Sequence, residues 1–241
     1  MRRIIVGAML ACLGTACGAR RDDDASTDRQ SRDTTPALSA DARPVLLCFG
    51  TSLTAGMGLD PEAAFPALLQ RKIDSAGYAF RVVNAGVSGE TAAAGLRRID
   101  WLLQQPIAVL LLELGANDAL RGQDVAAAKR NLQEIIDRTR ARYPEVRVVV
   151  AGMEAPPNLG SRYTREFRDL FVELARANHA VLIPFLLEGV AGRADLNQAD
   201  GIHPTAAGAR VVADRVWNTL EPVLRAAGRI GSAPQDGRNG P

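Results

Sequence analysis

Four short segments of the sequence contain residues that together could carry out acyl transfer. GTSLTAG places Ser52 after an apolar run, and NAGVSGET places Gly89 after a second run. LGAND contains Asn117, and QADGIHP places Asp200 three residues before His203. A serine hydroxyl, an imidazole–carboxylate pair and hydrogen-bond donors for an oxyanion are the parts that nucleophilic cleavage of an acyl group requires.

The spacing of Asp200 and His203 favours a catalytic pair. In a tight turn, a carboxylate three residues before an imidazole can accept a hydrogen bond from Nδ1. Nε2 of His203 is then free to take the proton of Ser52. Pro204 fixes the chain directly after the imidazole. The other histidine, His179, lies at a predicted helix-to-strand junction and is interpreted as structural.

Each of these residues also has a purely structural interpretation. Ser52 could be an ordinary turn residue, and Gly89 could serve only a tight turn. Asn117 and Asp118 could form an Asx turn or a helix cap, and Asp200 could cap the last helix. Their joint occurrence, with the segments spread along the chain in the order of its strands, favours the catalytic interpretation.

The elements that must position these residues alternate along the chain. Five apolar runs are expected to be strands: VLLCFG, FRVVNAG, IAVLLLELG, VRVVVAG and AVLIPF. They are apolar on both faces, as parallel strands covered by helices are, and helical segments separate them. The pattern predicts an α/β fold with a parallel sheet between two helical layers. Sites in such folds lie at the carboxyl ends of the strands.

The helical segments carry their own start signals and apolar stripes. In DPEAAFPALLQRKI, Asp60 is the predicted N-cap and Pro61 the first helical residue. The last helix is expected to run from Pro204 to about Leu224. Two further helices are predicted by apolar residues at helical spacing, namely Val125, Ala128, Leu132, Ile135, Ile136 and Thr139 in one, and Tyr163, Phe167, Leu170 and Leu174 in the other.

The composition excludes several classes of function. With 47% hydrophobic and 23% charged residues, the chain can bury the core of one globular domain. A net charge of +2 and 5% aromatic residues argue against nucleic acid as a partner. The three cysteines form no cluster with metal-ligand spacing, so no metal site is expected. Cys48 lies in an apolar run and is interpreted as a buried, inert thiol.

The N-terminal segment predicts export. Residues 1–17 begin with two arginines, continue with an apolar run and end in small residues, as a secretory signal does. Cys17 follows Thr15 and Ala16 and resembles the lipidated cysteine of bacterial lipoproteins, with Cys12 as an earlier candidate. A periplasmic protein or a membrane-anchored lipoprotein is therefore expected. Simple cleavage and release of the chain is the alternative to a lipid anchor.

The remaining domain boundaries follow from composition. Residues 18–43 are rich in arginine and aspartate and predict a disordered linker. Residues 44–228 are the predicted globular domain, and the polar residues 229–241 are a predicted disordered tail.

With these four blocks, the chain resembles the SGNH (GDSL-type) hydrolases. The resemblance runs from about Pro44 to Leu224 and rests on four blocks, FGTSLTAG, VNAGVSGET, LELGANDALRG and DGIHP. Within this family, the chain looks most like the bacterial group of multifunctional acyl-thioesterases, lysophospholipases and arylesterases. The resemblance implies a five-stranded parallel sheet of flavodoxin-like winding, hydrolysis of carboxylic esters and thioesters, and no cofactor.

The resemblance also implies a role for each residue of the four blocks. Ser52 would be the nucleophile, with Asp200 and His203 completing a triad. The amides of Ser52 and Gly89 and the side chain of Asn117 would form the oxyanion hole. One position departs from the family, because the first block usually reads Gly-Asp-Ser and here reads Gly-Thr-Ser. We expect this change to affect the positioning of the loop rather than hydrolysis itself.

The substrate is indicated less directly. Five residues of the loops after the third and fourth strands are candidate substrate contacts, namely Leu120, Arg121, Pro157, Leu159 and Tyr163. An apolar groove with a basic rim suits a lysolipid or an acyl thioester, although these residues could simply cover the edge of the sheet. A carbohydrate acetyl esterase of the same fold is the nearest alternative. A non-catalytic ligand-binding lipoprotein is the alternative from another class.

Overall fold

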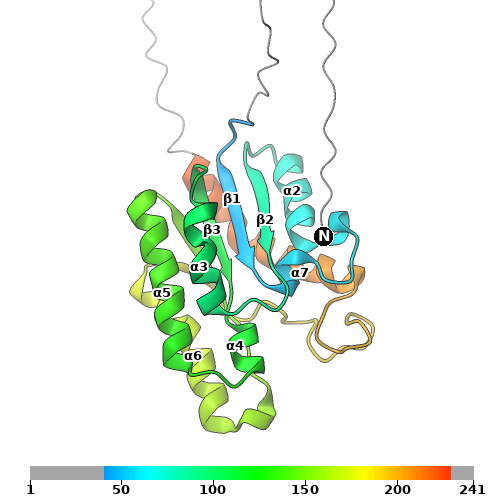
Figure 1. Cartoon of the computed structure of the whole chain (residues 1–241). Coiled ribbons are helices and arrows are strands. Elements are labelled where there is room, and N and C mark those ends of the chain that lie inside the picture. Colours follow the sequence, from blue (N-terminus) through cyan, green and yellow to red (C-terminus); the bar gives the residue numbers. More distant parts are fainter. Residues whose placement is uncertain (1–40, 229–241) are drawn as a thin grey trace, which may run out of the picture. The chain divides into compact units, whose positions relative to one another are not determined.

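The structure, a computed structural model, describes residues 41–228 of the 241-residue chain (Figure 1). The predicted signal with Cys17 and the predicted tail lie outside these residues. So does the predicted linker, apart from residues 41–43. No helix between residues 41 and 228 is long and apolar enough to cross a lipid bilayer.

A five-stranded parallel sheet forms the centre of the fold, as predicted. Its strands are β1 (Val45–Gly50), β2 (Arg81–Gly86), β3 (Ile107–Glu113), β4 (Arg147–Ala151) and β5 (Val181–Ile183). They lie in the order β2-β1-β3-β4-β5, which is the flavodoxin-like order. All strands remain parallel, and the direction in which successive strands are added to the sheet reverses after β2, so that β3 is added on the other side of β1. Every residue of β1, which lies between β2 and β3, is buried, and this burial explains why its sequence is apolar without alternation.

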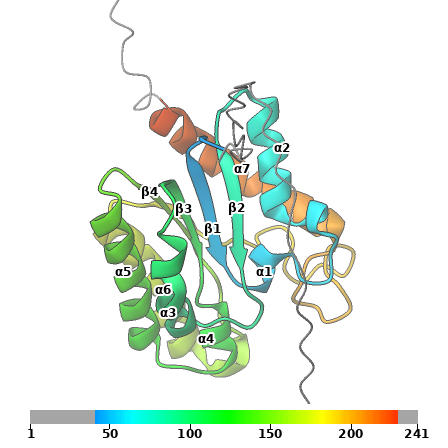
Figure 2. The same cartoon turned by 45° about the horizontal axis from the view of Figure 1, so that its top comes forward.

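Helices cover both faces of the sheet. They are α1 (Ser52–Ala55), α2 (Phe65–Ser75), α3 (Ala92–Leu102), α4 (Ala116–Leu120), α5 (Val125–Arg142), α6 (Ser161–Ala177) and α7 (Ala206–Gly228), with short 3₁₀ turns η1 (Pro61–Ala63) and η2 (Pro157–Leu159). Helices α2 and α7 pack together on one face, and α3, α5 and α6 pack on the other (Figures 1 and 2). This arrangement is what right-handed crossovers between the strands produce.

The core confirms the predicted apolar stripes. On α5 the buried residues are Ala128, Leu132, Ile135, Ile136 and Thr139, and on α6 they include Phe167, Leu170 and Leu174. Cys48 is a free cysteine buried in β1, and burial raises the pKa of its thiol. The thiol therefore stays protonated and unreactive, as predicted.

The starts of two helices differ from the prediction. Asp60 precedes only the short turn η1, without a capping hydrogen bond from its side chain, and α2 begins at Phe65. Pro66 explains the difference, because a proline ring is tolerated only in the first turn of a helix. The last helix begins at Ala206 rather than at Pro204. Its cap is Thr205, whose hydroxyl accepts a hydrogen bond from the Gly208 amide at 3.2 Å.

Candidate active site

The predicted nucleophile lies at the carboxyl edge of the sheet. Ser52 is the first residue of α1, a helix of four residues that follows β1 after Thr51 alone. Figure 2 shows α1 beside the arrow ends of β1 and β2. The Ser52 hydroxyl oxygen is 2.8 Å from Nε2 of His203, a residue 151 positions later in the chain.

His203 and Asp200 form the expected pair. Oδ2 of Asp200 is 2.7 Å from Nδ1 of His203, while Oδ1 accepts the backbone N–H groups of Ile202 and His203, both at 3.0 Å. These hydrogen bonds, the His203 amide foremost, lower the pKa of Asp200 to about 2. The carboxylate thus stays ionised at neutral pH and favours the tautomer with the proton on Nδ1, which leaves Nε2 to accept the Ser52 proton. Asp200 does not cap α7.

A second polar side chain, Gln198, ties the histidine loop to the serine loop. Its Nε2 donates hydrogen bonds to the carbonyl of Met57 at 2.8 Å and to that of Pro204 at 2.9 Å. Its backbone N–H donates to the carbonyl of His203 at 2.7 Å. Gln198 thus holds His203 at a fixed place beside the turn that carries Ser52. This role was not predicted, although Gln198 begins the QADGIHP segment.

The predicted oxyanion donors lie in the loops after β2 and β3. Gly89 has φ of +78°, a conformation that side chains disfavour, so glycine is required at this turn. Within residues 41–228 the backbone N–H groups of Ser52 and Gly89 donate no hydrogen bond. Nδ2 of Asn117 donates one of its two protons to the carbonyl of Glu90, at 3.0 Å. The backbone N–H groups of Ser52 and Gly89 and the second Nδ2 proton of Asn117 therefore remain available to donate hydrogen bonds to an oxyanion.

The loop that carries Gly89 is fixed by charged side chains. Glu90 is buried and forms an ion pair with Arg98, which also donates a hydrogen bond to the Ala85 carbonyl at 2.7 Å. Arg121 donates to the Gly89 carbonyl at 2.9 Å. A glycine loop needs such support if its amide is to stay aimed at one point.

Glu113, at the end of β3, also contacts the serine loop and was not among the predicted site residues. Its carboxyl group is fully buried and accepts hydrogen bonds from Thr51 and Thr54 on the serine loop. Burial raises the pKa of Glu113, and the hydrogen bonds from the two threonines lower it in part. The signal was present in the sequence, since Glu113 is the one acidic residue of an otherwise apolar strand.

The five predicted substrate contacts differ in whether their side chains are available to a ligand. The side chain of Leu120 is exposed and free to meet a ligand, whereas Arg121 is occupied by the Gly89 carbonyl. The hydroxyl of Tyr163 donates to the Gln123 carbonyl at 2.7 Å, which joins α6 to the loop after α4. Pro157 and Leu159 lie in η2. None of the five lines the pocket that contains Ser52.

That pocket is narrow and apolar, and it lies on the His203 side of the serine. Besides Ser52 and His203, its lining consists of Leu53, Gly56, Met57, Leu59, Phe65, Leu187, Pro204, Ala209 and Val212. Sequence reasoning did not predict these contacts, because the residues come from four separate segments that only the fold brings together.

Exposed apolar side chains gather in the loops that carry the site. The described residues contain seven large exposed hydrophobic side chains, and four of them belong to these loops, namely Met57, Val87, Leu120 and Ile202. Ile202 adjoins His203, and Leu120 lies in the same short helix as Asn117. An apolar rim of this kind fits a substrate with an apolar portion.

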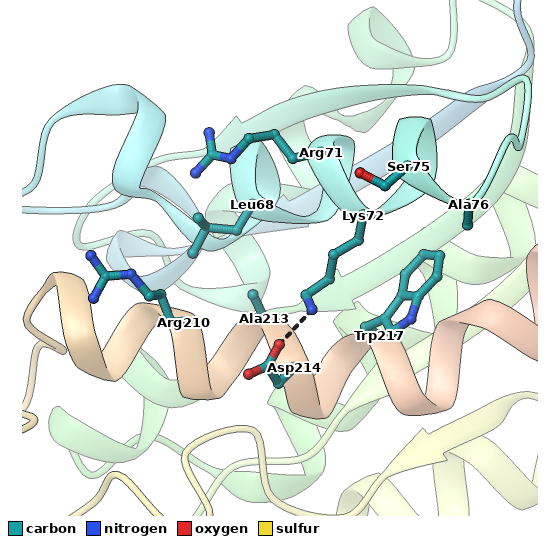
Figure 3. A pocket seen from close by; sticks show the side chains of 9 residues that line it. All are labelled: Leu68, Arg71, Lys72, Ser75, Ala76, Arg210, Ala213, Asp214 and Trp217. Carbon is teal, nitrogen blue, oxygen red and sulfur yellow. Dashed lines mark ion pairs between the residues drawn. The ribbon is translucent and has the colours of Figure 1, made fainter.

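A larger groove of about 610 Å³ lies elsewhere, between α2 and α7 (Figure 3). Lys72 and Asp214 form an ion pair across it at 2.5 Å, and Arg71, Arg210 and Trp217 also line it. None of its lining residues belongs to the four blocks, so we assign the chemistry to the smaller Ser52 pocket. Within residues 41–228, no group of three or more histidine, cysteine or acidic side chains could hold a metal ion.

The chain is similar in sequence to known esterases and thioesterases. Residues 48–211 match the family model described as the GDSL-like Lipase/Acylhydrolase family. Esterase TesA of Pseudomonas aeruginosa is 41% identical over 184 residues, which cover 76% of this chain and 90% of that protein. Thioesterase 1/protease 1/lysophospholipase L1 of Escherichia coli strain K12 is 36% identical over 186 residues, 77% of this chain and 87% of that protein.

The fold is also similar to that of solved esterases. The crystal structure of the psychrotrophic esterase EstA from Pseudoalteromonas sp., inhibited by monoethylphosphonate, superimposes with a TM-score of 0.71. The two chains are 33% identical, and the match covers 75% of this chain and 98% of EstA.

Proposed function

The chain belongs to the GDSL-like lipase/acylhydrolase family and is an enzyme that hydrolyses ester bonds, and we propose that Ser52, His203 and Asp200 are its catalytic triad. The predicted family is thereby confirmed. The observation that carries the proposal is the continuous chain of contacts from the Ser52 hydroxyl through both ring nitrogens of His203 to Asp200, at 2.8 and 2.7 Å.

The geometry supports a two-step hydrolysis. Nε2 of His203 takes the hydroxyl proton as the Ser52 oxygen attacks the carbonyl carbon of the ester. The tetrahedral intermediate collapses to an acyl-enzyme, and the alcohol or thiol leaves with the proton from His203. Water, deprotonated by His203, then attacks the acyl-enzyme and releases the acid and the free serine. Asp200 stabilises the imidazolium that forms in each step.

The oxyanion would be held by the free amides of Ser52 and Gly89 and by the second Nδ2 proton of Asn117. Asn117→Ala removes one donor that acts mainly in the transition state, so turnover should fall by about 10²–10³ with a smaller change in KM. The measurement is steady-state hydrolysis of an aryl ester. Near-normal turnover of this variant would exclude Asn117 from the oxyanion hole.

We propose lysolipids and other esters or thioesters of medium-length acyl chains as the substrate class. The exposed Met57, Val87, Leu120 and Ile202 support this choice, since the Ser52 pocket itself encloses only about 10 Å³ and an acyl chain would lie over the apolar rim. The name of the Escherichia coli relative, a thioesterase and lysophospholipase, points in the same direction. An acetyl esterase of carbohydrates, the alternative, would have less use for an apolar rim.

We further propose that the chain is exported and anchored by a lipid on Cys17. The support is the sequence of residues 1–17, with paired arginines, an apolar run and a cysteine after small residues. Expression of the full chain in a bacterium with labelled palmitate should give a labelled membrane protein, and Cys17→Ser should abolish the label. A label retained by Cys17→Ser would move the anchor to another residue, and unlabelled, soluble wild type would indicate cleavage and release.

The function is tested with p-nitrophenyl esters from acetate to palmitate, on the chain without residues 1–17 and on its Ser52→Ala variant. Medium chains should be turned over best, and the variant should lose at least about 10⁴-fold in turnover. Cleavage of acetate alone would favour the carbohydrate esterase. Absence of turnover on every ester would favour the ligand-binding alternative, and an active Ser52→Ala variant would exclude Ser52 as the nucleophile.

A further inference from the structure

We propose that Glu113 is a positioning residue for the nucleophile: its buried carboxyl group, through Thr51 and Thr54, holds the turn that carries Ser52. This inference rests on the proposed function, because it gives Ser52 the role of nucleophile. It adds a residue that lies outside the triad and outside the oxyanion hole.

The contacts of Glu113 bracket Ser52 on both sides. Oε2 accepts the backbone N–H of Thr51 at 2.8 Å and the hydroxyl of Thr54 at 2.7 Å. Oε1 accepts the Thr51 hydroxyl at 2.9 Å. One carboxyl group therefore binds the residue just before the nucleophile and a residue one half-turn of α1 after it. The peptide that supplies the Ser52 amide lies between these two anchors.

The fold places Glu113 under this turn through strand register. Glu113, the last residue of β3, pairs with Gly50, the last residue of β1. The carboxyl group can approach Thr51 because Gly50 has no side chain. A Cβ atom at Gly50 would collide with the Thr54 hydroxyl and with Oε2 of Glu113. The glycine therefore makes room for the carboxyl group.

The complete burial of the Glu113 carboxyl group supports a positioning role. Glu113 is 0% exposed, and Thr51 and Thr54 are 1% and 0% exposed. A buried carboxyl group is costly unless hydrogen bonds compensate it, and an apolar side chain would fill the same place at lower cost. The three donors that converge on Glu113 all belong to the serine turn. What the carboxyl group supplies is therefore rigidity at the point where Ser52 must meet His203.

The test uses a substitution that keeps the shape of the turn. Thr51→Val removes the hydroxyl and retains the backbone hydrogen bond to Glu113. If the carboxyl group aims Ser52, kcat for an aryl ester should fall by about tenfold or more while KM stays within about twofold. Thr51→Ser retains the hydroxyl and should stay within about threefold of the wild-type kcat. Glu113→Gln keeps the shape of the side chain but replaces one of the two acceptor oxygens with an NH₂ donor, and should lower kcat as Thr51→Val does.

Thr139→Val is the matched control. Thr139 is also a fully buried threonine, and its hydroxyl donates to the Ile135 carbonyl within α5 at 2.7 Å, away from the four blocks. Loss of a buried hydroxyl there should shift the melting temperature without changing kcat.

The outcomes separate this proposal from the proposed function. An active wild type with reduced kcat in Thr51→Val and Glu113→Gln, recovery in Thr51→Ser and no loss in Thr139→Val supports a positioning role. If Thr51→Val and Glu113→Gln are destabilised but keep wild-type kcat, Glu113 serves stability alone and the proposal fails while the proposed function stands. Wild type that hydrolyses no ester overturns both.

Discussion

The two loops that meet at the active site are held in place by opposite means. The serine turn rests on Glu113, which lies 62 residues from Thr51 and is fully buried with both of its threonine partners. The histidine turn is held by Asp200, only three residues away, whose side chain remains 43% exposed. A buried contact between distant segments fixes the nucleophile, and local hydrogen bonds near solvent fix the base.

This difference predicts how each side responds to substitution. A local turn keeps its hydrogen bonds within a few residues, so a change there should alter chemistry with little effect on stability. A buried carboxyl group contacts two elements of the core, so a change there should affect stability as well as kcat. The following substitutions test this contrast, in order of decreasing expected effect.

The largest effect is expected on the histidine side. Asp200→Asn should lower kcat by about 10²–10⁴, because an amide favours the wrong tautomer of His203 and cannot stabilise the imidazolium. The melting temperature should change little, since Asp200 is partly exposed. Steady-state kinetics and thermal unfolding of the same preparation measure both.

Asp195→Asn is the control for this change. Asp195 lies in the same loop region and pairs with Arg193 at 2.7 Å, with both side chains exposed. It should leave kcat and stability near wild type, as losses of surface ion pairs do. A large fall in the melting temperature of Asp200→Asn would contradict the contrast between the two turns.

An intermediate effect is expected where the two loops are joined. Gln198→Ala removes the hydrogen bonds to the carbonyls of Met57 and Pro204 and should lower kcat/KM by about three- to tenfold, because His203 is then less well placed. Gln133→Ala, which removes hydrogen bonds to Asp137 and Asn178 at 2.8 and 2.9 Å, is the control and should be fully active. Equal activity of the two variants would mean that Gln198 does not couple the loops.

The smallest effect is a pH dependence of stability on the serine side. Burial raises the pKa of Glu113 above its ordinary value of 4.5, so the folded chain retains this proton to higher pH than the unfolded chain. The contribution of Glu113 to the free energy of unfolding is therefore full below pH 4.5 and declines as the pH rises towards the raised pKa.

Glu113→Gln should remove this decline in the free energy of unfolding, because the amide does not titrate. The free energy of unfolding of the variant minus that of wild type should increase with pH, as measured by urea unfolding between about pH 4 and pH 8. The sign is opposite to that for Asp200, whose pKa is lowered to about 2 and whose contribution is lost only in strong acid. A difference that is constant with pH would show that Glu113 does not titrate between these limits.

The site was predictable from the sequence to the extent that its contacts are local. Asp200 and His203 could be paired because a tight turn over three residues brings a carboxylate to an imidazole. Gly89 and Asn117 could be placed at one edge because each follows its own parallel strand. Helix start signals were less informative where two prolines compete, because Pro61 begins η1 and Pro66 lies in the first turn of α2.

The sequence by itself determined the succession of strands and helices along the chain, the apolar core and the edge at which the four blocks meet. Periodicity and turn chemistry act over a few residues at a time, and the right-handed rule for crossovers then fixes which side of the sheet each helix covers. Only the tertiary structure decided what surrounds Ser52, because the partners of that loop come from distant segments. Strand register sets Glu113 beneath Thr51, and Gln198 reaches Met57 across 141 residues of chain. Long crossovers, not tight turns, join these parallel strands, so their register and the packing of the loops depend on contacts between distant segments.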